Sequence, residues 1–528
     1  MSDDDFTEDG EPIGEPEGPL ESEAPLEQER RSLYRHPLAA VGGALIASGA
    51  FAFILLSAVD IASEHENPYR SLVTFVGAPA IFTTGIVLFF IAARLQIRKA
   101  RKAGDDVHFM LRVEPSSPRY MRNLWIFLGL TFVFLAIVGW SGFKAYEATE
   151  TVGFCGESCH VMDPQNVTYV NGPHARVPCV DCHIGPGGSF WVKSKIDGIR
   201  QLVATVLDTY SRPIHTPVEN LRPAQQTCEG CHWPEQFFGQ KLTNTTYYRT
   251  DEANSPWTIS LLVNVGGGNP RTGELEGIHW HMLSAKTVEY IASDEDRQEI
   301  PWVRVTDPET GDVRTFTDPD GDIPDPTDPE TELRLFDCMD CHNRPSHSFE
   351  PPATALNLEL SKGNISKDLP FVRSIGLELI NAEYETKDQA TASIASGLAN
   401  YYATEYPQVA ASMAPEIAQA TETMQRIYSD NFFPEQNTDY RARTDNLSHF
   451  ANNGCFRCHF TDLQTATGER MLSSTCESCH AIVAQGPTDD VRELEDDLGG
   501  LDFIHPAEIG EVWKTVKCSQ CHNPASGY

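Results

Sequence analysis

Seven short groups, each of two cysteines followed directly by a histidine, recur between residues 155 and 522. Two residues separate the cysteines in six groups, and three residues separate them in the first group. The groups are Cys155/Cys159-His160, Cys179/Cys182-His183, Cys228/Cys231-His232, Cys338/Cys341-His342, Cys455/Cys458-His459, Cys476/Cys479-His480 and Cys518/Cys521-His522. Together they use all 14 cysteines of the chain.

This pattern is typical of covalent c-type haem attachment, in which two thiols hold the haem and the histidine supplies a ligand to iron. For a single cysteine pair, a zinc site or a redox disulfide would be the alternative. Zinc needs four ligands close together, and most of these pairs lie far apart in the chain. The sequence therefore predicts seven covalently attached c-type haems.

A haem iron takes a ligand on each side of its ring, and two strong ligands favour electron transfer, whereas an open side admits a substrate. Candidates for the second ligand are Met162, His174, His215, His279, His281, His347, His449 and His505. His279 and His281 are two residues apart, so we expect one of them to bind iron, with no preference between them. The candidates roughly match the distal positions in number, which predicts mostly six-coordinate haems with one that differs.

Three apolar stretches, at 37–59, 72–93 and 124–143, precede the haem groups. Each has about the 20 residues that a helix needs to cross a bilayer, and none contains an ionisable residue. Arginines and lysines are frequent before the first stretch and at 94–122, whereas 60–71 contains only Arg70. The positive-inside rule then predicts a cytoplasmic N-terminus and places the haem groups on the periplasmic side of a bacterial inner membrane.

The chain has a formal net charge of −35, which argues against nucleic acid as a partner. Residues 1–29 contain 12 acidic residues and no Lys or Arg, so we expect this tail to be disordered. Alternating residues at 258–265, 286–293 and 301–317 predict strands, the last stretch with a turn at 307–312. Residues 353–433 show helical patterns.

These features predict a mainly α protein in which three transmembrane helices precede a multihaem c-type cytochrome domain with a small β insertion. The predicted segments are a disordered acidic cytoplasmic tail at 1–35, a three-helix membrane anchor at 36–143, a three-haem module at 144–232, a β-rich insertion at 233–337 and a helical four-haem region at 338–528.

Residues 190–210 place Val192, Ile196, Ile199, Val203 and Val206 on one face of a predicted helix. Such a face packs into a protein core or lies at the membrane surface, where it would help to line a site for a lipid-soluble substrate. The sequence leaves both interpretations open.

The stretch 144–238 resembles the NapC/NirT family of membrane-anchored quinol-dehydrogenase cytochromes. The resemblance is carried by FCGESCHVM, GPHARVPCVDCHIGPGG, FWVKSKIDGIRQ and TCEGCHWPEQF. With three spans and seven haem groups, the whole chain is similar to the seven-haem inner-membrane cytochromes of metal-respiring bacteria. The chain departs from the family in the wider spacing of its first cysteine pair, in its extra spans and in its last three haem groups.

The resemblance implies oxidation of menaquinol or ubiquinol near the first haem and delivery of electrons to a periplasmic c-type cytochrome or terminal reductase. It also implies that either Met162 or His160 binds the first iron, and that Lys193, Lys195 and Asp197 are candidates for the quinol site. Two other functions remain open. The chain would reduce a small oxyanion such as nitrite at an open haem, or it would be a passive electron-carrying subunit of a larger membrane complex.

Overall fold

The computed structural model describes residues 37–62, 74, 77–102, 118–185, 188–216, 223–267, 277–471, 476–494 and 499–522. Its internal contacts divide the chain into two compact units, Met1–Ala145 and Tyr146–Tyr528. The acidic tail predicted at 1–35 lies outside the described residues, as do most of the residues predicted to connect the apolar stretches.

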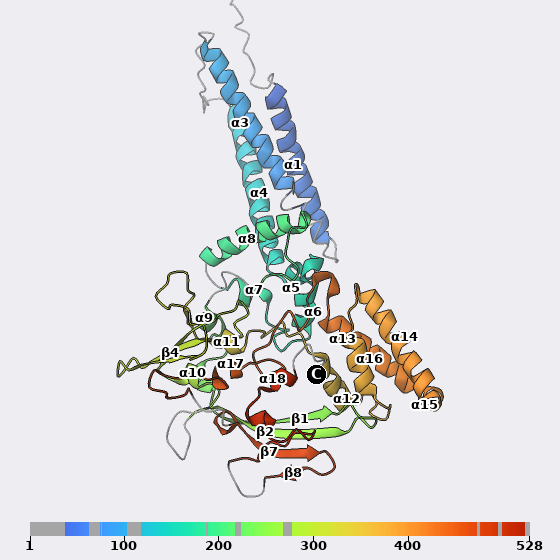
Figure 1. The fold of residues 1–528 in the computed structure, drawn as a ribbon. Coiled ribbons are helices and arrows are strands. Elements are labelled where there is room, and N and C mark those ends of the chain that lie inside the picture. Colours follow the sequence, from blue (N-terminus) through green and yellow to red (C-terminus); the bar gives the residue numbers. More distant parts are fainter. Residues whose placement is uncertain are drawn as a thin grey trace, which may run out of the picture. The chain divides into compact units, whose positions relative to one another are not determined.

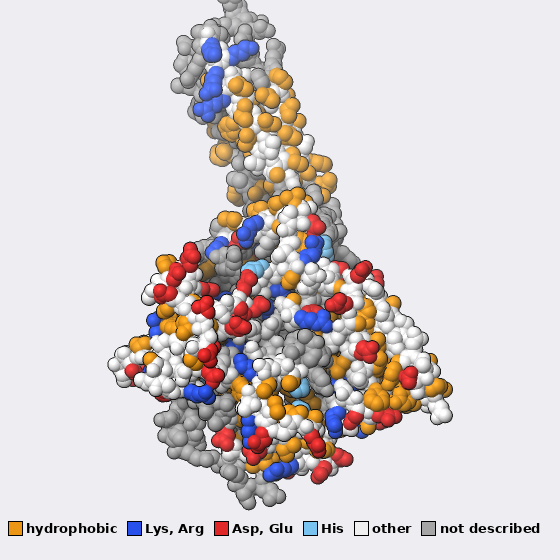
Figure 2. All heavy atoms as spheres, in the orientation of Figure 1, with side chains coloured by type: hydrophobic (Ala, Val, Ile, Leu, Met, Phe, Trp, Pro, Cys, Tyr) orange, Lys and Arg blue, Asp and Glu red, His pale blue; other side chains and the backbone are white. Residues whose placement is uncertain are grey.

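The first unit contains the helices α1 (Pro37–Ala62) and α3 (Ala78–Lys102), which lie side by side (Figure 1), and most of α4 (Pro118–Thr149). Two segments, Pro37–Ala58 and Ala78–Lys99, are long and apolar enough to cross a membrane. Only 22% and 11% of their apolar windows are buried inside the protein, unlike the core helix of a soluble domain. On the face shown in Figure 2, many of the described side chains of this unit are apolar, and Lys and Arg side chains gather at one end of it.

Two of the three predicted spans are thus found among the described residues. The second is described as a continuous helix from Ala78 onward, and most of its predicted start at 72–77 lies outside the described residues. Pro79, which lacks an amide hydrogen, suits the first turn of a helix. The third predicted span, 124–143, falls within α4, where several side chains are outside the described part of the chain.

Glycines let the backbones of α1 and α3 approach closely. A Cβ atom at Gly42 would meet the carbonyl oxygen of Gly85 and the amide nitrogen of Phe89 at 2.9 Å. A Cβ atom at Gly49 would meet the amide nitrogen of Phe82 at 2.7 Å. Small residues at such positions are what allows two membrane helices to pack tightly, because lipid offers no hydrophobic drive for their association.

The second unit contains two antiparallel sheets of four strands each. One has the order β5-β4-β3-β6 and is formed by β3 (Thr287–Ile291), β4 (Trp302–Thr306), β5 (Val313–Thr317) and β6 (Arg334–Leu335). The hairpin of β4 and β5 turns at 307–312, as the sequence predicts.

The other sheet has the order β1-β2-β7-β8 and joins two distant parts of the chain. It is formed by β1 (Gly239–Tyr248), β2 (Pro256–Gly266), β7 (His480–Pro487) and β8 (Arg492–Glu493). Trp257 of β2 lies opposite Pro487 of β7. The insertion predicted at 233–337 is therefore hydrogen-bonded to the C-terminal region, and that region, predicted as helical, also contains strands.

A group of helices without haem motifs forms the larger hydrophobic core. It contains α12 (Pro352–Ser361), α13 (Val372–Asn381), α14 (Lys387–Glu405), α15 (Pro407–Ser412) and α16 (Ala414–Asn431). Leu356, Ile380, Ile394, Leu398 and Met424 are fully buried there. The Thr386 side chain accepts a hydrogen bond from the Gln389 amide at the start of α14, which caps that helix. These helices confirm the pattern predicted at 353–433.

The close approach of α1 and α3 makes Gly42 sensitive to substitution. We expect Gly42→Leu to lower the stability of the protein by about 1–3 kcal/mol, since overpacking forces neighbouring backbone apart. The matched control is Gly43→Leu on the same helix, where a Cβ atom meets nothing within 4 Å. Thermal unfolding of the detergent-solubilised variants measures the difference. Equal melting temperatures for the two would contradict the close packing.

Candidate haem-binding site

Six of the seven motif histidines each face a second histidine, with ring centroids 5.8 to 6.3 Å apart. The pairs are His183–His347, His232–His174, His342–His279, His459–His281, His480–His449 and His522–His505. One member of each pair belongs to a cysteine motif, and the other is a ligand candidate predicted from the sequence.

This separation fits two imidazoles on opposite faces of one iron. A metal–imidazole nitrogen bond is about 2 Å long, so the two ring centroids lie about 6 Å apart once the ring size is added. The protein chain alone thus sets the spacing that a haem with two histidine ligands needs.

Hydrogen bonds fix the orientation of three of the second histidines. The Nδ1 atoms of His174, His347 and His279 lie 2.8, 3.0 and 2.9 Å from the backbone carbonyl oxygens of Pro345, Gln165 and Val265, respectively. A carbonyl can only accept, so each Nδ1 carries the hydrogen and the lone pair is left on Nε2. Ligating histidines in proteins are usually held in this way by a bond from the other ring nitrogen.

Burial keeps several of these imidazoles neutral. It lowers the pKa of His281, His347 and His449 to about 4. At neutral pH each ring therefore has a lone pair available for a metal, as coordination requires. The Nδ1 atoms of His281 and His449 are also buried without a hydrogen-bond partner.

Both histidines of the Gly-Ile-His-Trp-His stretch face a motif histidine, although we expected only one of them to bind iron. His279 is the N-terminal cap of the short helix α10 (Trp280–Leu283), and His281 lies within that helix. The two side chains reach different motifs: His279 stacks at 7° to His342, and His281 meets His459 edge-on at 61°. Sequence spacing alone could not show this, because it depends on where the two motifs lie in space.

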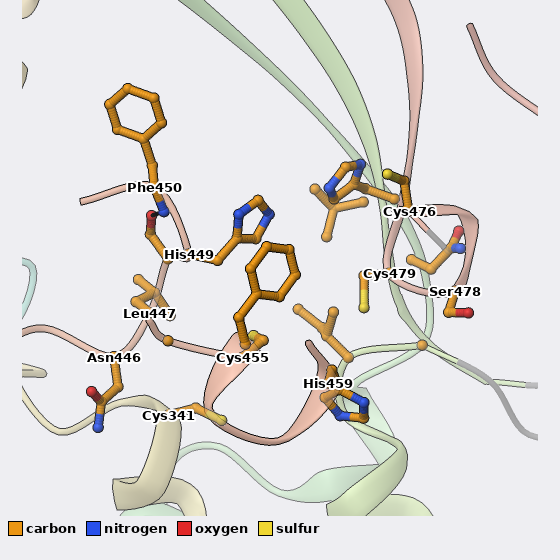
Figure 3. A pocket seen from close by; sticks show the side chains of 18 of the residues that line it. Cys341, Asn446, Leu447, His449, Phe450, Cys455, His459, Cys476, Ser478 and Cys479 are labelled. Carbon is orange, nitrogen blue, oxygen red and sulfur yellow. Dashed lines mark hydrogen bonds between the residues drawn. The ribbon is translucent and has the colours of Figure 1, made fainter. Parts of the chain in front are cut away.

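A cavity of about 3320 Å³ connects six of the motifs. Residues of the second to seventh cysteine groups line it, together with aromatic side chains such as Phe237, Tyr247, Phe336 and Phe450. In one part of it, His449, Cys455, Cys476 and Cys479 surround the same space (Figure 3). An apolar lining with a few convergent ring nitrogens suits a large planar apolar group that binds through a central metal.

Motifs that follow one another in the sequence are also neighbours in space. The Cys155 thiol is hydrogen-bonded to that of Cys179, and the Cys228 thiol to that of Cys338. In addition, Phe456 stacks on His449 at 4.1 Å, and Phe450 stacks on His522 at 4.4 Å. The cofactors of adjacent motifs would therefore be held close together, as electron transfer between them requires.

The cysteines of the first motif lie outside this cavity. Neither Cys155 nor Cys159 is among the described residues that line it. The wider spacing gives the physical reason. In the second motif both cysteines belong to one helical turn, α7 (Cys179–His183), whereas Cys155 lies in α5 (Val152–Gly156) and Cys159 follows the end of that helix.

The backbone at Cys159 is extended, with φ −131° and ψ 115°, and this residue caps the turn η3 (His160–Met162). Its side chain is partly buried, as is that of Cys155. The structure thus does not bring Cys159 into this cavity, and haem attachment at all seven groups stays a prediction.

The first motif also differs from the other six in its ligands. His160 and Met162 lie together in η3, just before α6 (Asp163–Val170). Six of the candidate histidines face other motifs. The seventh, His215, is exposed and has its Nε2 3.3 Å from Glu295 Oε1. The structure thus does not bring His215 to a motif, and it leaves the choice between His160 and Met162 open.

Charged side chains lie beside the first motif. Lys195, on α8 (Gly188–Val206), donates to Glu150 Oε1 at 2.6 Å and to Thr149 Oγ1 at 3.1 Å. Both charges act on the Cys155 thiol, although its raised pKa is due first to its hydrogen bond with Cys179 and to burial. Asp197 lies 3.9 Å from Arg200, and the Lys193 side chain is exposed. The sequence did not point to Glu150, because this residue belongs to no recognisable local motif.

The helix α8 also has an apolar face, and this face is exposed. Ile196, Ile199, Val203 and Val206 are 62%, 65%, 51% and 75% exposed. Within the described part of the chain this face is therefore not packed in a core, and of the two interpretations of 190–210 the core-packing one is wrong. An exposed apolar stripe of this length is typical of a surface that meets a membrane or another protein.

Comparison with known proteins agrees with this architecture. Residues 119–217 match the model of the NapC/NirT cytochrome c family, N-terminal region. The chain is 35% identical over 494 residues to the cytochrome c-type protein ImcH of Geobacter sulfurreducens, covering 93% of this chain and 96% of that protein. It is 35% identical over 78 residues to the cytochrome c-type protein NrfH of Wolinella succinogenes, covering 14% of this chain and 44% of that protein. No solved structure matches.

The pairing of His281 with His459 can be tested by changing one ligand. We expect His281→Met to raise the midpoint potential of one haem, because a methionine opposite histidine favours ferrous iron more than a second histidine does. A spectroelectrochemical titration of the purified protein measures the potentials. His215→Met is the matched control and should leave every potential unchanged. A titration of His281→Met that overlays the wild type would show that His281 is not a ligand.

Proposed function

Because the chain belongs to the NapC/NirT family of membrane-anchored multihaem c-type cytochromes, we propose that it is a quinol dehydrogenase. It oxidises menaquinol or ubiquinol at the first haem and passes electrons through seven haems to a periplasmic c-type cytochrome or terminal reductase. The observation that carries the proposal is the asymmetry of the motifs. In six motifs the histidine faces a second histidine, as electron carriers need, and among the described residues none faces His160.

The residues of this chain account for how seven haems would be held. The 14 cysteines would form the thioether bonds, and the six facing histidine pairs would bind the irons of the second through seventh haems. At the first motif, His160 or Met162 supplies one ligand, and the opposite side is left for quinol to approach. When bound, each haem supplies an iron that takes up and gives off one electron.

Lys195 and Glu150 are suited to handle the protons of a quinol. Oxidation of a quinol to a quinone releases two electrons and two protons. A hydroxyl of the quinol would donate to the Glu150 carboxylate, which lies beside the Cys155 position and is already oriented by the Lys195 ammonium. Lys193 and Asp197 on the same helix are further candidates, as the family resemblance implies.

The exposed apolar face of α8 gives a lipid-soluble substrate a route to this site. We infer that this face lies in the interfacial region of the bilayer, with the apolar side chains toward the acyl chains. The apolar helices α1, α3 and α4 would anchor the chain in the inner membrane. The distribution of Arg and Lys supports a cytoplasmic N-terminus and a periplasmic haem-binding unit.

A second function is favoured by the same asymmetry. An iron with one protein ligand would also bind a small oxyanion such as nitrite. The two functions differ in the direction of electron flow between the haems and the substrate. Quinol would reduce the haems of a quinol dehydrogenase, whereas nitrite would reoxidise the reduced haems of a reductase. A passive electron-carrying subunit would show neither reaction in isolation.

The role of Lys195 gives the sharpest test. In the purified full-length protein in lipid, we expect a menaquinol analogue to reduce the haems, and Lys195→Gln to lower kcat/KM for the quinol by about tenfold or more. This is the effect of losing one charge-assisted hydrogen bond of about 1.5–3 kcal/mol. The rate is followed by the absorbance of reduced haem.

The matched control is Arg200→Gln, which removes the same charge from an exposed position on the same helix. Full reduction of both variants by dithionite confirms that their haems are intact. If the wild type is not reduced by quinol in lipid, the proposed activity is wrong. If Lys195→Gln and Arg200→Gln are equally active, the activity stands and Lys195 has no part in it.

A further inference from the structure

Two arginines that lie far apart in the sequence meet inside the haem-binding unit. Arg443 is only 3% exposed, and its Nη1 donates to Thr216 Oγ1 at 2.8 Å while its Nη2 donates to the carbonyl of Ile214 at 2.7 Å. The Nη2 atom of Arg344 approaches the same Thr216 hydroxyl at 3.4 Å. Two positive charges thus share one neutral oxygen in the interior.

The described residues give this pair no adjacent anion. Neither guanidinium has a carboxylate oxygen within 4 Å in the described part of the chain, and Asp445 and Asp296 act on them only from farther away. The Nε atom of Arg344 is buried and has no acceptor. Buried charges in proteins are paired with an opposite charge, because the loss of hydration otherwise makes the fold unstable.

A third buried arginine shows what a purely structural arrangement looks like in this protein. Arg457 is 5% exposed, and each of its three side-chain nitrogens donates to a backbone carbonyl, those of Gly454, Arg297 and Asp340. All of its nitrogens have partners. In contrast, Arg344 and Arg443 meet at one hydroxyl, and the buried Nε of Arg344 has no acceptor among the described residues. Two adjacent positive charges with an unused buried donor point to an anionic group that binds between them.

The position of the pair indicates which group this is. Arg344 is three residues before His347, which faces His183. Arg443 meets Arg344 at the Thr216 hydroxyl, so both arginines belong to the part of the chain that positions His347. A haem carries its carboxylates on propionate side chains at the edge of the ring, and arginine is the side chain best suited to bind a carboxylate through two parallel hydrogen bonds.

We propose that Arg344 and Arg443 form a binding site for a propionate carboxylate of the haem held between His183 and His347. This inference rests on the haem ligation proposed above. The two guanidiniums neutralise the carboxylate in the interior, and their positive charge disfavours the ferric state of the nearby iron. They therefore hold the potential of this haem above the value that it would have without them.

The test compares Arg443→Gln with Arg441→Gln, which removes the same charge from the half-exposed Arg441–Asp439 ion pair two residues away. In Arg443→Gln, we expect the midpoint potential of one haem to fall while the other six stay unchanged. We also expect a shift in the propionate bending band of the resonance Raman spectrum. Arg441→Gln should show neither. Identical titrations and spectra for the two variants would overturn the proposal.

A free anion is the other source of a carboxylate or similar group at this site. If such an anion binds there, the potential of the wild type will depend on the concentration of added chloride or acetate, and Arg443→Gln will lose that dependence. This outcome would overturn the assignment to a propionate. Independence from both anions, with the shift in Arg443→Gln, supports it.

A second variant and a count of the attached haems separate failure of the arginine site from failure of the haem ligation. Where Arg443→Gln does not accumulate, Arg344→Gln tests the same site, since Arg344 makes only the long bond to Thr216. Mass spectrometry of the intact protein counts the attached haems. A wild type without haem at Cys179 and Cys182 would refute the proposed ligation, whereas a fully loaded protein whose Arg443→Gln and Arg344→Gln variants show no shift would refute only the arginine site.

Discussion

The distance of about 6 Å between facing imidazoles constrains the fold of the haem-binding unit more than any apolar core does. Between residues 146 and 240, only Val161, Pro164, Tyr169 and Ala224 are buried apolar side chains among those described. The larger core lies in α12 to α16, which carry no motif. Few buried apolar side chains therefore hold the first three motifs, and the histidine pairs bring together parts of the chain that are separated in sequence.

The same constraint explains the unusual connections of the unit. β2 ends near His279, and β7 begins with His480 at the sixth motif. Pairing of β2 with β7 therefore brings the helix α10, with His279 and His281, into the region of the last motifs. The sheet thus helps to position histidines that face or belong to three different motifs.

Local patterns in the sequence predict the attachment cysteines, the set of ligand candidates, two apolar helices and the hairpin of β4 and β5, because each depends on neighbouring residues alone. They do not predict which histidine faces which motif, or that Cys159 lies apart from the shared cavity, since both depend on tertiary contacts across the chain. For the same reason they missed the pairing of β2 with β7 and the contact of Glu150 with Lys195. The exposure of α8 likewise depends on what packs against it.

The distribution of charge in the interior is the reverse of that in the whole chain. Acidic residues outnumber Lys and Arg by 75 to 40, and Asp and Glu side chains are spread over the visible face of the second unit (Figure 2). Yet the buried charged side chains among those described are Asp340, Glu359, Arg373, Arg443 and Arg457, a majority of arginines. An interior that holds several anionic cofactors would need this excess of cations, because buried carboxylates are stable only beside positive charge. The acidic surface would then keep the protein soluble while the arginines inside balance the groups that its cysteines bind.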